Sequence, residues 1–258
     1  MTTYSLPYFT ADLTGQTALI TGASSGLGRR FALTLASSGA KVALAARRLD
    51  RLTDLRDEIE LLGGHATVVA LDMTDSGSII TAVEEVQREF GTVSILVNNA
   101  GVPDAQLAHK MPIALIDRVL NTNLRGPFII ACEVARRLID SGQSGRIVNI
   151  ASMGAFQYSI RGASMYSISK AAVVRMTEVL AVEWAQFGIN VNAIAPGIFS
   201  SEMIDGMISR IGDMTDSLPR KRIGHPAQLD STLLYLVSPS SEFVTGTIIK
   251  VDDAQSGR

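Results

Sequence analysis

Hydrophobic residues occur along this chain in two alternating kinds of segment. Seven short runs are rich in β-branched and aliphatic residues with little polar alternation, a pattern typical of strands buried on both faces. These candidate strands are TALIT (17–21), KVALAA (41–46), ATVVAL (66–71), SILVNN (94–99), RIVNIA (146–151), INVNAI (189–194) and TIIKVD (247–252). Longer segments with helical patterns lie between them, including residues 28–39, 49–63, 78–91 and about 165–187.

The alternation of strand and helix predicts an α/β fold with a doubly wound parallel sheet of about seven strands and helices on both faces. Ligands of such sheets bind beyond the carboxyl ends of the strands. The segments that follow the candidate strands are polar or rich in glycine: TGASSGLG, AARR, LDM, NNAG, IASMG and IAPG. We therefore expect a ligand crevice at this edge of a single domain that spans residues 1–258.

One region departs from the alternating pattern. Residues 197–225 are rich in Met, Gly and Ser and show the least regular spacing of apolar positions. Irregular segments of this length are often functional loops that cover a site. We expect a mobile substrate lid at about 197–225.

Charge and composition exclude several classes of function. The formal net charge is −2, so the chain lacks the basic surface that nucleic acid requires. No apolar run approaches the ~20 residues that cross a bilayer, and MTTYSLPYFTADL at the start does not resemble a secretory signal. A single cysteine, Cys132, fits a reducing compartment, so we expect a cytoplasmic protein without a membrane partner. The three histidines lack ligand spacing, and no metal site is expected.

The first strand leads into a glycine-rich turn. Gly22, Gly26 and Gly28 lie between this strand and the next helix, where glycine permits a tight turn and a helix N-terminus favours a pyrophosphate. The same residues also spell GASSG, the pattern of a hydrolase nucleophile elbow with Ser24 as nucleophile. Such a site would need His225 with Asp213 or Asp216, and a loop after an earlier strand for its oxyanion hole. The motif follows the first strand, so the dinucleotide interpretation is favoured.

A tyrosine and a lysine stand four residues apart in YSISK, residues 166–170. On a helix this spacing places both side chains on one face, about 6 Å apart at their bases. A free phenol has a pKa of about 10 and is a poor acid or base near neutrality. A neighbouring ammonium favours the phenolate, so we expect Lys170 to lower the pKa of Tyr166. Without the other motifs, the same pair would indicate only two residues on a helix face.

Taken together, the motifs resemble those of the short-chain dehydrogenase/reductase family over residues 13–252. They are TGASSGLG (21–28), NNAG (98–101), Asn123 in TNLRG, Ser152 in VNIAS, YSISK (166–170) and the pair Pro196 and Gly197. The resemblance implies a Rossmann-type fold, a nicotinamide cofactor, and reversible oxidation of an alcohol to a carbonyl. It also implies a homotetramer paired through the long helices.

The resemblance assigns a catalytic tetrad. Tyr166 would exchange a proton with the substrate oxygen, and Lys170 would also hold the nicotinamide ribose. Ser152 would bind the substrate oxygen, and Asn123, within a helix, would hold a water that passes protons to Lys170. The implied cofactor contacts are Gly22, Ser24, Ser25, Gly26, Leu27, Gly28, Arg47, Arg48, Asp72, Met73, Asn99, Ala100, Gly101, Tyr166, Lys170, Pro196, Gly197, Phe199 and Ser201.

The second strand favours NADP over NAD. Dinucleotide folds that bind NAD commonly place an acidic residue at its end, but this chain has Ala46 followed by Arg47 and Arg48. Arginine suits a 2′-phosphate, and we expect Arg47 to contact it, whereas Arg48 has an equally reasonable role in the solvated surface. Ser25 stands where many NADP-preferring relatives carry a basic residue, which would weaken the preference.

The residues that flank the tetrad suggest the substrate. Met153, Phe156, Gln157, Tyr158, Ile160, Pro103, Phe199, Met203 and Met207 are mostly apolar, with Arg161 as the main charge. They favour a small or medium hydrophobic ketone. Sugar or polyol dehydrogenation and reduction of 3-oxoacyl thioesters remain alternatives, although Gln143 and Phe187 stand where carrier-protein reductases often have arginine. A dinucleotide sensor without catalysis is the non-enzymatic alternative.

Overall fold

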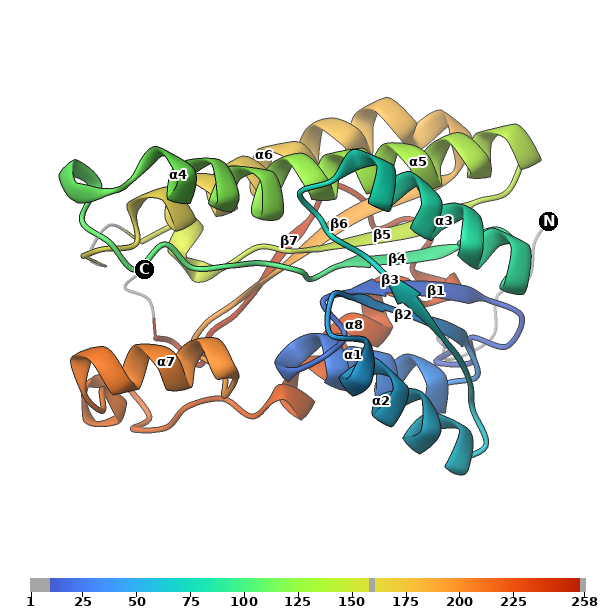
Figure 1. The fold of residues 1–258 in the computed structure, drawn as a ribbon. Helices are drawn as coiled ribbons and strands as arrows, with labels where there is room; N and C mark the ends of the chain where they lie inside the picture. Colours follow the sequence, from blue (N-terminus) through green and yellow to red (C-terminus); the bar gives the residue numbers. More distant parts are fainter. Residues whose placement is uncertain (1–9, 158–160, 256–258) are drawn as a thin grey trace.

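A computed structural model describes residues 10–157 and 161–255 (Figure 1). Its described part contains one parallel sheet of seven strands in the order β3-β2-β1-β4-β5-β6-β7. The strands are β1 (Thr17–Thr21), β2 (Lys41–Ala46), β3 (His65–Ala70), β4 (Ile95–Asn98), β5 (Gly145–Ile150), β6 (Ile189–Pro196) and β7 (Ile248–Val251). Each candidate strand is confirmed, with ends displaced by no more than two residues.

Helices cover both faces of the sheet, as predicted. They are α1 (Gly26–Ser37), α2 (Leu49–Leu61), α3 (Ser76–Phe90), α4 (Ile113–Leu120), α5 (Gly126–Ser141), α6 (Ser164–Trp184), α7 (Glu202–Ile211) and α8 (Asp230–Val237). Helices α3, α5 and α6 pack on one face of the sheet, and α1, α2 and α8 pack on the other (Figure 1). Two apolar cores therefore lie on opposite faces of one Rossmann-type sheet.

The strand order reverses between β1 and β4, the position where doubly wound sheets open a crevice. At this point the Thr21 hydroxyl accepts hydrogen bonds from the backbone N–H groups of Asn99 and Ala100, both at 3.0 Å. The Asn99 side chain in turn donates to the Thr21 carbonyl at 3.0 Å. These bonds hold the glycine-rich turn after β1 against the loop after β4.

The region expected to be irregular contains a helix, so that part of the prediction is wrong. Helix α7 begins after Ser201, whose hydroxyl accepts a hydrogen bond from the N–H of Ile204. The pairs Met203 and Ile204, and Met207 and Ile208, recur four residues apart and supply a helical stripe that the Met, Gly and Ser content concealed. Beyond the carboxyl ends of the strands, α7 and α4 lie on opposite sides of the sheet (Figure 1).

Candidate active site

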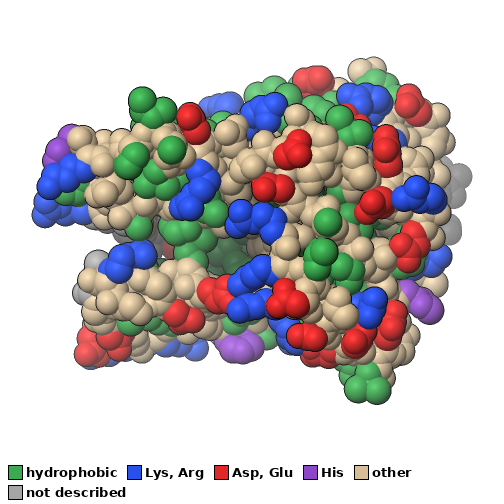
Figure 2. Space-filling view, in the orientation of Figure 1, with side chains coloured by type: hydrophobic (Ala, Val, Ile, Leu, Met, Phe, Trp, Pro, Cys, Tyr) green, Lys and Arg blue, Asp and Glu red, His purple; other side chains and the backbone are tan. Residues whose placement is uncertain are grey.

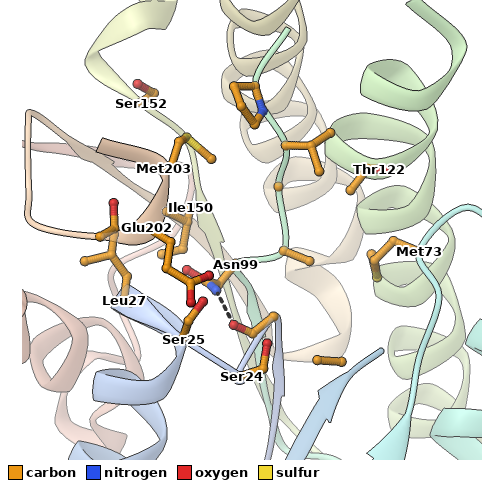
Figure 3. A pocket seen from close by; sticks show the side chains of 18 of the residues that line it. Ser24, Ser25, Leu27, Met73, Asn99, Thr122, Ile150, Ser152, Glu202 and Met203 are labelled. Atoms are coloured by element: carbon orange, nitrogen blue, oxygen red, sulfur yellow. Dashed lines mark hydrogen bonds between the residues drawn. The ribbon is translucent and has the colours of Figure 1, made fainter. Parts of the chain in front are cut away.

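A cavity of about 640 Å³ lies at the carboxyl ends of the strands. In Figure 2 the molecule is hollowed between two lobes, and hydrophobic side chains and charged side chains of both signs border the hollow. The cavity brings together residues from the glycine-rich turn, the end of β2, the loop after β4, and the helices α6 and α7. Figure 3 shows the contributions of the turn (Ser24, Ser25), of the loop after β4 (Asn99) and of α7 (Glu202, Met203). The sequence-predicted residues that line it are Gly22, Ser24, Ser25, Gly26, Leu27, Arg47, Arg48, Asp72, Met73, Asn99, Ala100, Gly101, Ser152, Tyr166, Lys170, Pro196, Gly197, Phe199 and Ser201.

The turn after β1 requires glycine at two positions for different reasons. Gly22 has a φ of +69°, and a Cβ there would lie 2.9 Å from the Cα of Ala100. At Gly28 a Cβ would lie 2.3 Å from the carbonyl oxygen of Gly22. Gly28 is buried in α1 and, unlike the other predicted residues of the turn, does not line the cavity. Its role is to let α1 approach the turn closely.

The two arginines after β2 differ in their surroundings. Arg47 is exposed at the cavity, whereas Arg48 is half-buried. The Arg48 guanidinium donates to the hydroxyl of Ser25 at 2.8 Å and to that of Ser24 at 3.0 Å. In the described part of the chain, no histidine bonds to the Ser24 hydroxyl, so the arrangement does not support the hydrolase interpretation.

Ser152, Tyr166 and Lys170 meet on one wall of the cavity. Ser152 begins a short 3-10 turn, and its hydroxyl accepts a hydrogen bond from the N–H of Gly154 at 3.0 Å. The Tyr166 hydroxyl is hydrogen-bonded to Ser152. Lys170 Nζ donates to the carbonyl of Ile150 at 2.7 Å and lies 5.8 Å from the centre of the Tyr166 ring. Three groups able to bind or exchange protons therefore converge near one point.

Burial decides the ionisation of this group. Burial raises the pKa of Tyr166 above its ordinary value, although the hydrogen bond from Ser152 opposes the shift and the charge of Asp104 adds to it. The expectation that Lys170 lowers this pKa is wrong for this structure, because desolvation of the phenolate outweighs the other influences. Lys170 is only 4% exposed, and burial lowers its own pKa to about 8.

Asn123 lies behind the cavity wall instead of lining it. It is 1% exposed, in a π-helical turn (Asn121–Arg125) between α4 and α5. Its side-chain oxygen accepts from the N–H of Val102 at 2.8 Å, and its side-chain nitrogen donates to the carbonyl of Val102 at 3.0 Å and to Ser169 Oγ at 3.1 Å. The side chain thus fastens the loop after β4 to α6.

The structure also reveals a functional residue that the sequence analysis missed. Asp104, only 6% exposed, accepts hydrogen bonds from the N–H groups of Met165 at 2.8 Å and Tyr166 at 3.2 Å. It therefore caps, from a distant loop, the helix that carries Tyr166 and Lys170. The sequence did hold one sign that such a residue was needed. Ala163 provides no side-chain cap for α6 and the first turn holds no acidic residue, so the free N–H groups there require an acceptor from elsewhere in the chain.

Comparison with known proteins places this arrangement in a family. The model of the short chain dehydrogenase family matches residues 16–210. The chain belongs to the short-chain dehydrogenase/reductase family. This confirms the resemblance inferred from the motifs and makes the protein an oxidoreductase of a family that uses a nicotinamide dinucleotide.

The relatives cover two of the anticipated substrate classes. A 2-dehydro-3-deoxy-D-gluconate 5-dehydrogenase from Dickeya dadantii is 37% identical over 94% of this chain and 96% of its own. A 3-oxoacyl-[acyl-carrier-protein] reductase from Thermotoga maritima is 35% identical over 93% of this chain and 97% of its own. A candidate NAD(P)-dependent gluconate 5-dehydrogenase from Beutenbergia cavernae, solved with NADP at low occupancy, has a TM-score of 0.88 and 34% identity, covering 95% and 98% of the two chains.

The substrate wall of this short-chain dehydrogenase differs from the expectation. Pro103, Phe199 and Met203 line the cavity, whereas Met153 and Phe156 pack in the core of the α6 face. Gln157, Arg161 and Met207 do not line it, and the expected residues Tyr158 and Ile160 lie outside the described residues. Lining residues that the sequence analysis missed include Val102, Arg118, Thr122, Glu202, Ile204 and Arg210.

In the described ranges 10–157 and 161–255, no group of three or more His, Cys, Asp or Glu side chains is placed to hold a metal ion. None of the helices there is both long enough and apolar enough to span a membrane.

Proposed function

We propose that this short-chain dehydrogenase uses NADP(H) to interconvert a secondary alcohol and a ketone. The observation that carries the proposal is the meeting of Ser152, Tyr166 and Lys170 on one wall of a cavity whose other end holds a glycine-rich turn and two arginines. A dinucleotide sensor would need the turn but no buried proton donor. The intact group therefore supports an enzyme.

The cavity residues suit a dinucleotide phosphate. Gly22 and Gly26 present no side chain at two positions of the turn near the N-terminus of α1, where a pyrophosphate is favoured. Arg47 and Arg48 would hold the 2′-phosphate, and Lys170 would hold the nicotinamide ribose, beside which Gly101 leaves room. When bound, the nicotinamide would supply or accept the hydride.

The ionisation of the site favours reduction at neutral pH. Because burial raises the pKa of Tyr166, its phenol stays protonated and can donate to the oxygen of a ketone. Ser152 would donate a hydrogen bond to the same oxygen and stabilise the charge that develops there. The charge of protonated Lys170, 5.8 Å from the centre of the Tyr166 ring, would favour the phenolate that remains after donation.

For the substrate, the rim of the cavity supports an acidic sugar derivative. Arg118 and Arg210 line the cavity, and within the described residues neither forms a hydrogen bond or an ion pair. Unpaired guanidinium groups suit a carboxylate, the group that distinguishes gluconate-type substrates. The second candidate is the hydrophobic ketone, which the apolar wall formed by Phe199 and Met203 favours.

Four other expectations remain proposals. The single sheet supports one domain, and α7 at the cavity supports a lid formed by residues 197–225. Phe128, Val179 and Val182 are exposed on α5 and α6, which supports pairing of these helices in a homotetramer, a state that light scattering would test. The unpaired thiol of Cys132 supports a reducing cytoplasmic setting.

The proposal is tested by an absorbance screen of NADPH and NADH with sugar-acid ketones, simple ketones and 3-oxoacyl thioesters. Turnover with NADPH and a sugar-acid ketone is expected. Tyr166→Phe should lower kcat by a factor of about 10² to 10⁴ while cofactor binding, followed by fluorescence, is retained. Binding without turnover of any substrate by the unmodified protein would favour the sensor, and ester cleavage lost in Ser24→Ala would favour the hydrolase.

A further inference from the structure

The first residue of α7 places a carboxylate in the region expected to bind the 2′-phosphate. Glu202 lines the cavity, and its Oε2 lies 3.0 Å from Nη1 of Arg48. The other carboxylate oxygen contacts both Arg48, at 3.3 Å, and Arg51. In Figure 3 the Glu202 side chain extends from α7 toward Ser25 and Ser24. A carboxylate of the protein therefore occupies the arginine cluster that a cofactor phosphate would need.

Arg48 connects three separate parts of the chain. Its guanidinium donates to Ser24 and Ser25 in the glycine-rich turn and to Glu202 on α7, while Arg48 itself follows β2. A guanidinium has five N–H donors, and these contacts use both Nη groups and Nε. A phosphate that binds Arg48 must therefore displace or share donors held by Glu202, at Nη1, or by the two serine hydroxyls, at Nε and Nη2.

The balance between the two anions is close. The side chains of Arg48 and Glu202 are 41% and 51% exposed, so their ion pair is screened by water and weak. A phosphate monoester carries up to two negative charges and accepts more hydrogen bonds than a carboxylate does. The phosphate should displace Glu202, and the loss of the Arg48–Glu202 ion pair should weaken binding of NADP. A cofactor without the 2′-phosphate leaves this ion pair in place, so its affinity should not be reduced.

We propose that Glu202 competes with the 2′-phosphate of NADP for Arg48 and so limits how strongly the protein prefers NADP over NAD. This inference rests on the proposed NADP function and adds a specificity-determining residue on α7. It also explains how a chain with two arginines after β2 could bind NAD: the internal carboxylate satisfies Arg48 when no phosphate is present.

The test measures binding of cofactor fragments by isothermal titration calorimetry at low salt. The probes are 2′,5′-ADP, which carries the 2′-phosphate, and 5′-AMP, which lacks it. Glu202→Gln should tighten 2′,5′-ADP binding about two- to fivefold and leave 5′-AMP binding unchanged. Glu202→Ala should do the same, because it also removes the charge.

Asp205→Asn is the matched control. Asp205 lies in the same first turn of α7 and is exposed, and its carboxylate makes no contact with Arg48. The Asp205→Asn substitution removes the same charge as Glu202→Gln and should leave the affinities for 2′,5′-ADP and 5′-AMP unchanged. If Asp205→Asn tightened 2′,5′-ADP binding as much as Glu202→Gln did, the effect would be one of net charge and the proposal would be overturned. The proposal would also be overturned if both Glu202→Gln and Glu202→Ala bound 2′,5′-ADP with the affinity of the unmodified protein.

A double-mutant cycle separates this inference from the proposed function. Arg48→Ala should weaken 2′,5′-ADP binding, and in that background Glu202→Gln should no longer tighten it. If Arg48→Ala weakened binding but Glu202→Gln had no effect on the unmodified background, the NADP site would stand and the competition would be refuted. If neither Arg47→Ala nor Arg48→Ala affected 2′,5′-ADP, the NADP proposal itself would fail.

Discussion

The carboxylate of Asp104 accepts a hydrogen bond from the backbone N–H of Tyr166, across 62 positions of sequence. It accepts a second bond from Met165, so one buried carboxylate satisfies two of the free N–H groups at the start of α6. Asp104 lies two residues after Val102, whose backbone N–H donates a hydrogen bond to the side chain of Asn123. The loop that borders the cavity and the helix that carries Tyr166 and Lys170 are therefore joined at one residue.

Asp104→Asn should weaken this cap and change the ionisation of the tyrosine. Asparagine can still accept a hydrogen bond, so the loss is mainly that of a negative charge at a helix N-terminus, about 0.3–1 kcal/mol, which urea unfolding would measure. Because the charge of Asp104 raises the pKa of Tyr166, its removal should lower that pKa. Alcohol oxidation needs the phenolate, so the pH at which its rate rises should move to lower values. Asp117→Asn, at an exposed position on α4, is the control and should alter neither quantity.

Lys170 should make stability depend on pH in the alkaline range. Its pKa is about 8 in the folded protein, below the ordinary lysine value of 10.5. Between these values the unfolded chain binds more protons, so this residue makes stability increase as pH rises from 8 to 10.5. Below pH 8 the folded protein bears the full cost of the buried charge, up to about 3 kcal/mol.

Lys170→Met tests that cost directly. The variant should gain stability relative to the unmodified protein at pH 7, and the gain should shrink at pH 9.5, as measured by urea midpoints at both values. Lys110→Met, at an exposed lysine, should show the same small difference at both pH values. A Lys170→Met difference that stayed constant with pH would mean that the lysine is not desolvated as the structure indicates.

Gly28→Ala should disturb the glycine-rich turn after β1 because the added methyl group has no room there. The new methyl group would lie 2.3 Å from the carbonyl oxygen of Gly22, which the backbone cannot easily accommodate. Overpacking of this kind costs about 1–3 kcal/mol, and binding of 5′-AMP should weaken together with stability. In Gly77→Ala the nearest atom is the side-chain oxygen of Asp75 at 3.3 Å, so this control should retain both properties.

The sequence alone was sufficient for the sheet and for the family. Strands such as residues 41–46 and 146–151 were found because an apolar run between polar turns is a local pattern, which burial on both faces imposes directly. The glycine-rich turn, NNAG and YSISK were equally local. Their order along the chain indicated the family before any contact was known.

The tertiary structure decided what depends on distant residues and on burial. The contacts of Asp104 with Tyr166 and of Glu202 with Arg48 span 62 and 154 positions, and no local spacing encodes them. The sign of the pKa shift of Tyr166 was also hidden, because a sequence shows the neighbouring lysine but not the water that folding removes from the phenol. Contacts and desolvation arise only when the chain closes around the site, so they could be obtained only from its three-dimensional arrangement.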